Sequence, residues 1–164
     1  MKKLIISSFV LFFAISTISL ASPLRNIDDE IVTSRIADNV LQHFGYNFFR
    51  ASDVSWTVEK EFQKATFKLN GKTSYALYDL DGKFLVATQK CEKSELAPKV
   101  QQSLDQEYAS YTLVQALKVI SRASDYKFTD DTNSVWLNLE SNGKSLVAIV
   151  YPGNTISVVK TTTK

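Results

Sequence analysis

Two carboxylates one residue apart, Asp79 and Asp81, stand beside Gly82 in the stretch YDLDGKFLV, and they raise the first question about chemistry. They could belong to a calcium loop, form a catalytic pair, or mark the bend between two strands. An EF-hand loop needs oxygen ligands over about twelve residues and a distal bidentate glutamate, and residues 83–87 supply neither. Acid–base catalysis needs buried surroundings, which an exposed turn lacks. Asp-Gly between apolar segments is a hairpin signal, so we predict a turn, with no metal and no cofactor.

Cys91 and His43 are the other residues that could carry out chemistry, and each is the only one of its type. A single cysteine excludes an intramolecular disulfide. Three interpretations of Cys91 remain: an exposed thiol, half of a bridge to another chain, or a nucleophile that uses His43 as its base. The sequence shows no Ser/His/Asp arrangement, phosphate-binding glycine loop or cluster of metal ligands, so we predict that the protein is not an enzyme.

The start of the chain predicts export. Met1-Lys2-Lys3 precedes an apolar run from Leu4 to Ile18 and small residues up to Ala21, which is typical of a secretory signal peptide over residues 1–21. A membrane anchor is the alternative, but the run is shorter than the roughly 20 apolar residues of a spanning helix. We therefore expect a periplasmic or secreted protein, without a membrane span after cleavage, whose domain covers residues 22–164.

Charge excludes one class of partner. The chain has 19 basic and 17 acidic residues, and removing Lys2 and Lys3 leaves 17 of each. A balanced chain without a basic run lacks the electrostatic signature of nucleic-acid binding. We expect shape and apolar contact to hold any partner.

Periodicity predicts two helices and eight strands. Apolar residues recur at helical spacing over 27–44 and again over 97–110, where Pro98 suits a first turn. Alternation predicts strands, and Asn70-Gly71 and Asn142-Gly143 are turn signals. A helix over 113–123 is an alternative to the fifth strand, and residues 160–164 are expected to fray. The predicted strands are 54–59, 64–69, 73–78, 84–86, 111–122, 135–140, 146–151 and 156–159.

The two halves share one order of signals. Residues 27–90 and 94–160 both place a helix first, then a strand, an Asn-Gly turn followed by lysine, and further strands. We therefore predict an α+β fold: a tandem repeat of a helix followed by antiparallel strands, with the helices packed on one face of a curved antiparallel sheet.

The strand and turn pattern resembles a known family, and Trp56, Tyr78, Asp79-x-Asp81-Gly82 and Pro98 carry the likeness. It is similar to the PepSY-like, β-lactamase-inhibitory-protein-like proteins, which are small secreted bacterial proteins. The resemblance implies a concave antiparallel sheet with helices on its other side, and a binding or inhibitory role without catalysis. The second half departs from it, because Tyr-Pro-Gly-Asn at 151–154 replaces the acidic turn. No residue matches the contact set of such an inhibitor, so inhibition of a β-lactamase is not carried over.

The favoured function is a non-catalytic binding module that presents a sheet face to a protein or peptide of the cell envelope. Trp136 is the first candidate contact, because it shares a strand face with Asn138 and Glu140, and a large aromatic on a polar face is typical of an interface anchor. Tyr78 and Tyr151, near turns, are weaker candidates. Trp136 could instead pack beneath neighbouring side chains. A carrier of a small apolar ligand held between helix and sheet is the alternative function, followed by a hydrolase.

Overall fold

The structure is a computed structural model that describes residues 36–123 and 133–163. The predicted signal peptide, the first part of the predicted helix 27–44 and most of the polar loop 129–133 lie outside these residues. Neither α-helix of the described residues is long and apolar enough to cross a membrane.

The described residues contain two short α-helices, one 3₁₀ helix and eight strands. Each predicted strand is confirmed, with ends shifted by a few residues. The helical alternative for residues 113–123 is wrong, since Thr112–Arg122 is a strand. The predicted fraying is wrong for residues 160–163, because Thr163 pairs with Lys144 in the last ladder. The elements are α3 Asp38–Asn47, β1 Ser52–Val58, β2 Phe62–Leu69, β3 Lys72–Asp79, β4 Phe84–Lys90, η1 Lys93–Glu95, α4 Pro98–Gln106, β5 Thr112–Arg122, β6 Val135–Ser141, β7 Lys144–Val150 and β8 Ile156–Thr163.

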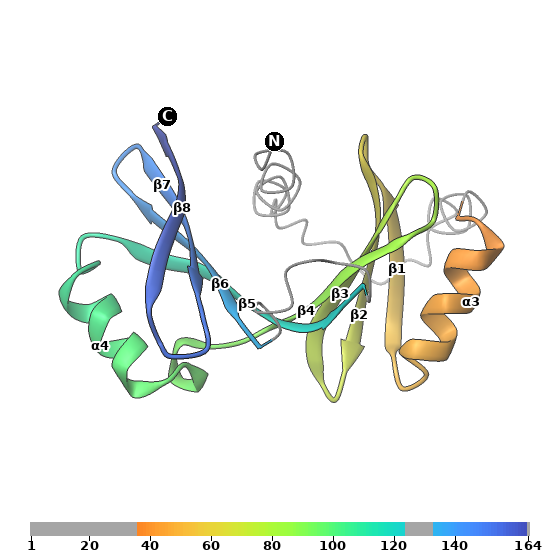
Figure 1. Cartoon of the computed structure of the whole chain (residues 1–164), viewed down its shortest axis with the longest axis horizontal. Helices are drawn as coiled ribbons and strands as arrows, with labels where there is room; N and C mark the ends of the chain where they lie inside the picture. The colour runs from red at the N-terminus through yellow and green to blue at the C-terminus, as the bar shows by residue number, and fades with distance from the viewer. Residues whose placement is uncertain (1–35, 124–132, 164) are drawn as a thin grey trace. The chain divides into compact units, whose positions relative to one another are not determined.

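The predicted fold class, a tandem α+β repeat of helix and strands, is wrong. Strands β1 to β8 follow one another in sequence order within one eight-stranded sheet, and the pairs β1–β2, β2–β3, β3–β4, β5–β6, β6–β7 and β7–β8 are antiparallel (Figure 1). The described residues are mostly β. Helical spacing over-predicted the helices: α4 ends at Gln106, and the described part of the first helix begins only at Asp38. Tight turns join most neighbouring strands, and such hairpins favour a meander over modules that each begin with a helix.

The described residues divide into two compact units. The α3 unit contains α3, β1–β3, residues 84–89 of β4 and residues 120–123. The α4 unit contains η1, α4, residues 112–119 of β5, and β6–β8.

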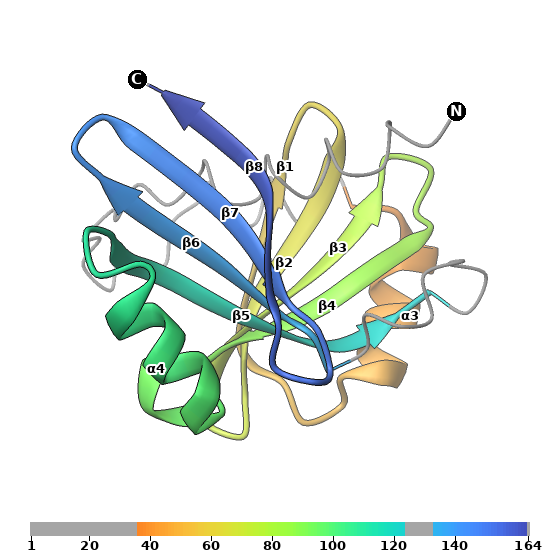
Figure 2. The same cartoon turned by 60° about the vertical axis from the view of Figure 1, so that its left-hand side comes forward.

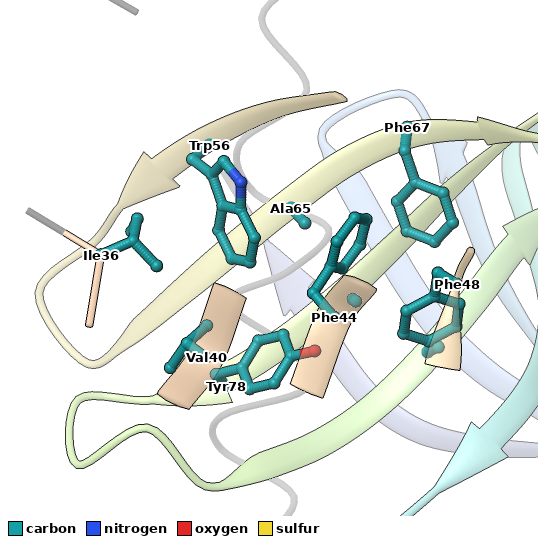
Figure 3. Close-up of a cluster of buried hydrophobic side chains, with 10 residues drawn as sticks. Ile36, Val40, Phe44, Phe48, Trp56, Ala65, Phe67 and Tyr78 are labelled. Atoms are coloured by element: carbon teal, nitrogen blue, oxygen red, sulfur yellow. The ribbon is translucent and has the colours of Figure 1, made fainter. Parts of the chain in front are cut away.

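Aromatic side chains fill the core of the α3 unit (Figure 3). Val40 and Phe44, one helical turn apart on α3, are both buried in this core, toward the strands. The ring of Phe44 lies 5.0 Å from that of Phe67 and 5.3 Å from that of Trp56, both edge to face, the arrangement that aromatic pairs prefer. This packing fixes α3 on the strands.

Aliphatic side chains fill the core of the α4 unit. Figure 2 shows the helix and the strands β6 to β8 of this unit. Val100 and Leu104 lie one turn apart on α4 and are buried, and Pro98 occupies the first turn, where its missing N–H costs nothing. These residues pack on alternate positions of the strands, namely Leu137, Leu139, Leu146, Ala148 and Val150.

Candidate functional site

The acidic stretch at residues 79–82 is the turn between β3 and β4, as predicted. The backbone N–H of Lys83 donates to Asp79 Oδ1 at 2.8 Å, and that of Gly82 donates to the Asp79 carbonyl at 3.1 Å. Asp79 therefore closes the turn with its side chain and its backbone. Within the described residues, no group of three or more His, Cys, Asp and Glu side chains could hold a metal ion.

Gly82 has two reasons to be glycine. Its φ is +86°, in the left-handed region. A Cβ built on it would also lie 2.8 Å from Asn39 Nδ2 and 3.1 Å from Val40 Cγ2. The turn thus approaches α3 more closely than any side chain allows, which places Lys83 and Phe84 beside the helix.

The structure separates the three predicted binding residues. Trp136 is 6% exposed and Tyr78 is fully buried, whereas Tyr151 is 40% exposed. On the neighbouring strands Leu117 and Ile149 pair with Trp136, and both are buried. Among these three, only Tyr151 offers a large exposed surface, and their contact with a partner stays a prediction.

Cys91 and His43 fall in different units, so neither unit by itself contains the thiol–imidazole pair that the nucleophile interpretation of Cys91 requires. Cys91 is half-buried at the edge of a cavity of about 460 Å³ in the α4 unit. Apolar and charged residues share this lining, and Lys93 forms a salt bridge with Asp105 there. This cavity is therefore not the closed apolar pocket that a carrier of a small apolar ligand would need.

Two exposed aromatic residues that the sequence analysis missed lie at the end of α3. Tyr46 is 85% exposed and Phe49 is 76% exposed, and the Arg50 guanidinium carbon lies 5.3 Å from the centroid of the Phe49 ring. We call Tyr46, Phe49 and Arg50 the aromatic patch. The spacing of the aromatic residues could have predicted this patch. Phe44 and Phe48 lie on the apolar side of α3, whereas Tyr46 and Phe49 do not.

A groove of about 930 Å³, which we call the α3 groove, lies beside the same helix. Every residue that lines it belongs to the α3 unit. Its lining comes from α3, the end of β2, the turn before β4 and the end of β5, namely Asn39, His43, Asn47, Phe48, Leu69, Gly82, Lys83, Phe84, Ile120, Ser121, Arg122 and Ala123.

The imidazole of His43 is held in place on one side of this groove. Its Nδ1 lies 3.0 Å from the Tyr78 hydroxyl, and its ring stacks on Phe84 with centroids 5.0 Å apart. Burial raises the pKa of Tyr78. The phenol therefore stays protonated and can donate its hydrogen to Nδ1, in which case the imidazole N–H is on Nε2.

Comparison with known proteins shows the fold. No protein-family model matches the sequence, and no curated protein matches it. Solved structures do match: a DUF2874 family protein from Bacteroides ovatus, with 16% identity and a TM-score of 0.60, covers 77% of this chain and 86% of its own. A BLIP-like protein from Bacteroides fragilis, with 12% identity and a TM-score of 0.59, covers 75% and 86%.

A protein from Bacteroides eggerthii that is proposed to be periplasmic is also similar, with 13% identity, a TM-score of 0.59, and coverage of 77% of this chain and 88% of its own. The chain thus has a BLIP-like fold. Identities this low establish the architecture alone, so the expected likeness of fold to β-lactamase-inhibitory-protein-like (BLIP-like) proteins is confirmed, and the link to PepSY proteins stays a prediction.

Proposed function

We propose that this protein is a non-catalytic module of the periplasm or the extracellular space that binds another protein. The observation that carries the proposal is the aromatic patch. Tyrosine, arginine and other large side chains dominate binding energy at protein interfaces, and an isolated fold gains nothing by exposing two aromatic rings. The BLIP-like fold and the similarity to a protein proposed to be periplasmic support the same role and location.

The patch suits an interface because its parts are already arranged. Arg50 lies over the ring of Phe49, a cation–π contact that orders both side chains before a partner arrives. Phe48, the residue between the helix and Phe49, is buried against Phe44 and Phe67. This anchoring fixes the backbone that carries the patch, so binding orders fewer side chains.

The test compares variants in pull-downs from the cell envelope, followed by binding measurements with the purified captured protein. Tyr46→Ser with Phe49→Ser removes the patch. Val114→Ser with Val158→Ser removes two exposed apolar side chains of the α4 unit and is the matched control. We expect the first pair to weaken binding by at least roughly tenfold, which corresponds to about 1.4 kcal/mol, and the control pair to leave it within about twofold. Equal affinity of both variants and the wild-type protein would exclude the patch as the interface.

The sheet face around Trp136 stays a second proposed surface. Trp136→Phe keeps an aromatic ring at the position and removes the indole N–H, and urea denaturation of the variant checks that the fold is retained. Loss of partner binding in this variant, with binding unchanged in the Tyr46→Ser/Phe49→Ser variant, would transfer the proposal from the aromatic patch to that face.

A further inference from the structure

Strand β1 lies at one edge of the sheet. It comes first in the strand order and pairs with β2. An edge strand has a row of backbone N–H and C=O groups without a neighbouring strand to bond to. Of the seven residues of β1 only Trp56 is buried, and Val54 and Val58 are each 42% exposed. The edge is therefore accessible along its length.

One hydrogen bond just beyond β1 fixes the direction in which its backbone groups point. The Glu59 N–H donates to the Phe62 carbonyl at 2.8 Å, so these two residues form a hydrogen-bonded pair. In an antiparallel ladder, hydrogen-bonded pairs alternate with pairs that are not hydrogen-bonded. Counting back along the register, Thr57 also bonds to β2, whereas Trp56 and Val58 do not. The N–H and C=O groups of Trp56 and Val58 therefore point away from β2, toward the open edge.

The open edge is short. The register between β1 and β2 shifts between Ser52 and Ser55, and Asp53 in this interval has a φ of +52°. A bulge of this kind bends an edge strand and discourages the pairing of long strands. The regular part of the edge therefore runs over residues 54–58, a length that suits a short extended segment.

The side chains of this edge indicate which segment would fit. Val54 and Val58 stand two positions on either side of Trp56, so apolar residues at every second position of an added strand would pair with them. Asp53 and Glu59 stand at the two ends of the regular part. Basic residues at the ends of the added strand would therefore face opposite charges.

The other charged residues nearby do not cancel these two acids. Lys60 and Glu61 lie together in the turn that follows β1 and offset each other in charge. Arg50 precedes β1, and its guanidinium group lies over the ring of Phe49. The edge thus carries a net negative charge at the end next to Glu59.

A second copy of the chain fits this edge less well than a basic strand does. Antiparallel pairing of two copies about Trp56 would align Val54 with Val58, but it would also place Asp53 of each copy opposite Glu59 of the other. Like charges directly opposite each other destabilise a sheet. A strand with lysine at these two positions keeps the apolar contacts and replaces the repulsion with attraction.

We propose that β1 binds an extended segment of a partner protein as an additional antiparallel strand, with β-branched apolar residues at alternate positions and a basic residue at each end. The backbone groups of Trp56 and Val58 bond to the backbone of this segment, and Asp53 and Glu59 pair with its basic residues. The proposal rests on the proposed protein-binding role and deepens it by giving the form and charge of the partner. It uses groups that the aromatic patch does not contain.

Amide hydrogen exchange of the purified protein tests the edge first. The Thr57 N–H should exchange slowly, whereas the N–H groups of Trp56 and Val58 should exchange fast, because they point away from β2. Slow exchange of Trp56 and Val58 at every protein concentration would show that the chain covers its own edge. Protection that rises with protein concentration would show that a second copy covers it. Either result would overturn the proposal.

A synthetic peptide then tests the partner. The probe is the heptapeptide Lys-Val-Thr-Val-Thr-Val-Lys with blocked ends, and amide chemical shifts report its affinity and location. When its central valine faces Trp56, the N–H groups of its second and fourth residues point at β1, and those of the third and fifth point away. N-methylation of the second and fourth residues should weaken binding at least roughly tenfold, and N-methylation of the third and fifth should change it by less than about twofold. Bound peptide should also slow the exchange of the Trp56 and Val58 N–H groups.

A matched pair of protein variants tests the same bonds from the other side. Val58→Pro removes an N–H that points outward, which an edge strand tolerates, and its ring obstructs the added strand. It should weaken binding of the unmethylated peptide at least roughly tenfold, whereas Val58→Thr keeps the N–H and should stay within about twofold. If the proline variant folds poorly, the two methylated peptides on the wild-type protein still decide.

A charge swap tests the ends of the strand. A peptide with glutamate in place of both lysines should bind the wild-type protein at least roughly threefold more weakly. In the variant Asp53→Asn with Glu59→Gln the two peptides should bind alike, and asparagine accepts the positive φ at position 53. Equal affinity of both peptides for the wild-type protein would overturn the assignment of a basic partner.

Absence of binding, equal affinity of the two methylated peptides, or shifts away from residues 53–59 would each overturn the proposed strand addition. The Tyr46→Ser/Phe49→Ser variant keeps β1, so it should bind the peptide as the wild-type protein does. Strand addition can therefore fail while the aromatic patch still binds a partner. The patch can also fail in the pull-down while the peptide still binds to β1.

Discussion

The two units place a helix on strands in the same manner but fill their cores with different chemistry. The α3 core is built from aromatic rings, including Phe44, Phe67 and Tyr78, whereas the α4 core is built from leucine and valine. Of these aromatic residues, tyrosine also carries a hydroxyl group, and a buried phenol needs a hydrogen-bond partner. Aliphatic side chains make no such demand.

This difference in core composition explains why a polar contact links the core to the surface in the α3 unit. The Tyr78 hydroxyl finds its partner in His43, and His43 then lines the α3 groove beside Asn39 and Asn47. In the α4 unit, the buried residues of the helix are Val100 and Leu104, and both are aliphatic. The aromatic core thus connects to polar residues of the α3 groove, and the aliphatic core serves packing.

The largest expected effects come from truncating each core. Phe67→Ala should lower the free energy of unfolding by about 3–5 kcal/mol and Leu137→Ala by about 2–5 kcal/mol, because both side chains are fully buried. The phenylalanine should cost more, since it also loses ring contacts with Phe44 and Phe48. Urea denaturation measures both, and Thr161→Ala, exposed on β8, should stay within about 0.5 kcal/mol. A loss below about 1 kcal/mol for either core variant would show that its core is loosely packed.

Turn glycines of the two units give the next comparison. Gly82 and Gly143 have similar positive φ angles, +86° and +70°, but only Gly82 lies against a helix. Gly143→Ala should therefore cost about 1 kcal/mol from backbone strain alone. Gly82→Ala should cost about 2–3 kcal/mol, because the added methyl group also collides with Asn39 and Val40. Thermal and urea denaturation of the two variants measure the difference, and equal losses would mean that α3 can move away from the turn.

The strands and turns could be predicted from the sequence because their signals are local. Asn70 and Gly71 both have positive φ, at +54° and +77°, as a two-residue hairpin turn requires. The order of the sheet could not be predicted in the same way. Similar local signals in the two halves favoured a repeat that begins with a helix, whereas the helices are too short to define the architecture.

The exposure of Trp136 could not be predicted from alternation. Asn138, on the same strand face, suggested that this face meets water, yet Asn138 is itself buried and its Oδ1 accepts a hydrogen bond from Ser145 at 3.3 Å. A buried polar side chain is tolerated when it is hydrogen-bonded. The type of one residue on a strand is therefore only weak evidence that its face is exposed to water. The groove was missed for a different reason, since its residues come from four separate segments.

Removing the hydrogen bond between Tyr78 and His43 should have the smallest effect on stability at neutral pH. It also tests whether the Tyr78 hydroxyl, the polar group of the aromatic core, is shielded from water. Tyr78→Phe should lower stability by about 0.5–1.5 kcal/mol at pH 7, because one partly buried hydrogen bond is lost. As the pH rises above 10, the stability difference between the wild-type protein and the variant shrinks and then reverses. Burial raises the pKa of Tyr78 above its ordinary value of 10.0, so above pH 10 the unfolded chain loses the proton while the folded protein keeps it.

This difference in proton binding makes the wild-type protein lose stability as pH rises through and above 10, by up to about 1.4 kcal/mol per pH unit from this group. Phenylalanine cannot ionise, so the variant should lose less, and the stabilities of the two proteins should converge between pH 10 and 11. Tyr75 and Tyr108, whose pKa values burial also raises, remain in both proteins and leave a common residual slope. Urea denaturation at pH 7, 10 and 11 measures the convergence. If stability fell in parallel with pH in the two proteins, the Tyr78 phenol would ionise freely in the folded protein. The Tyr78 hydroxyl would then be open to water.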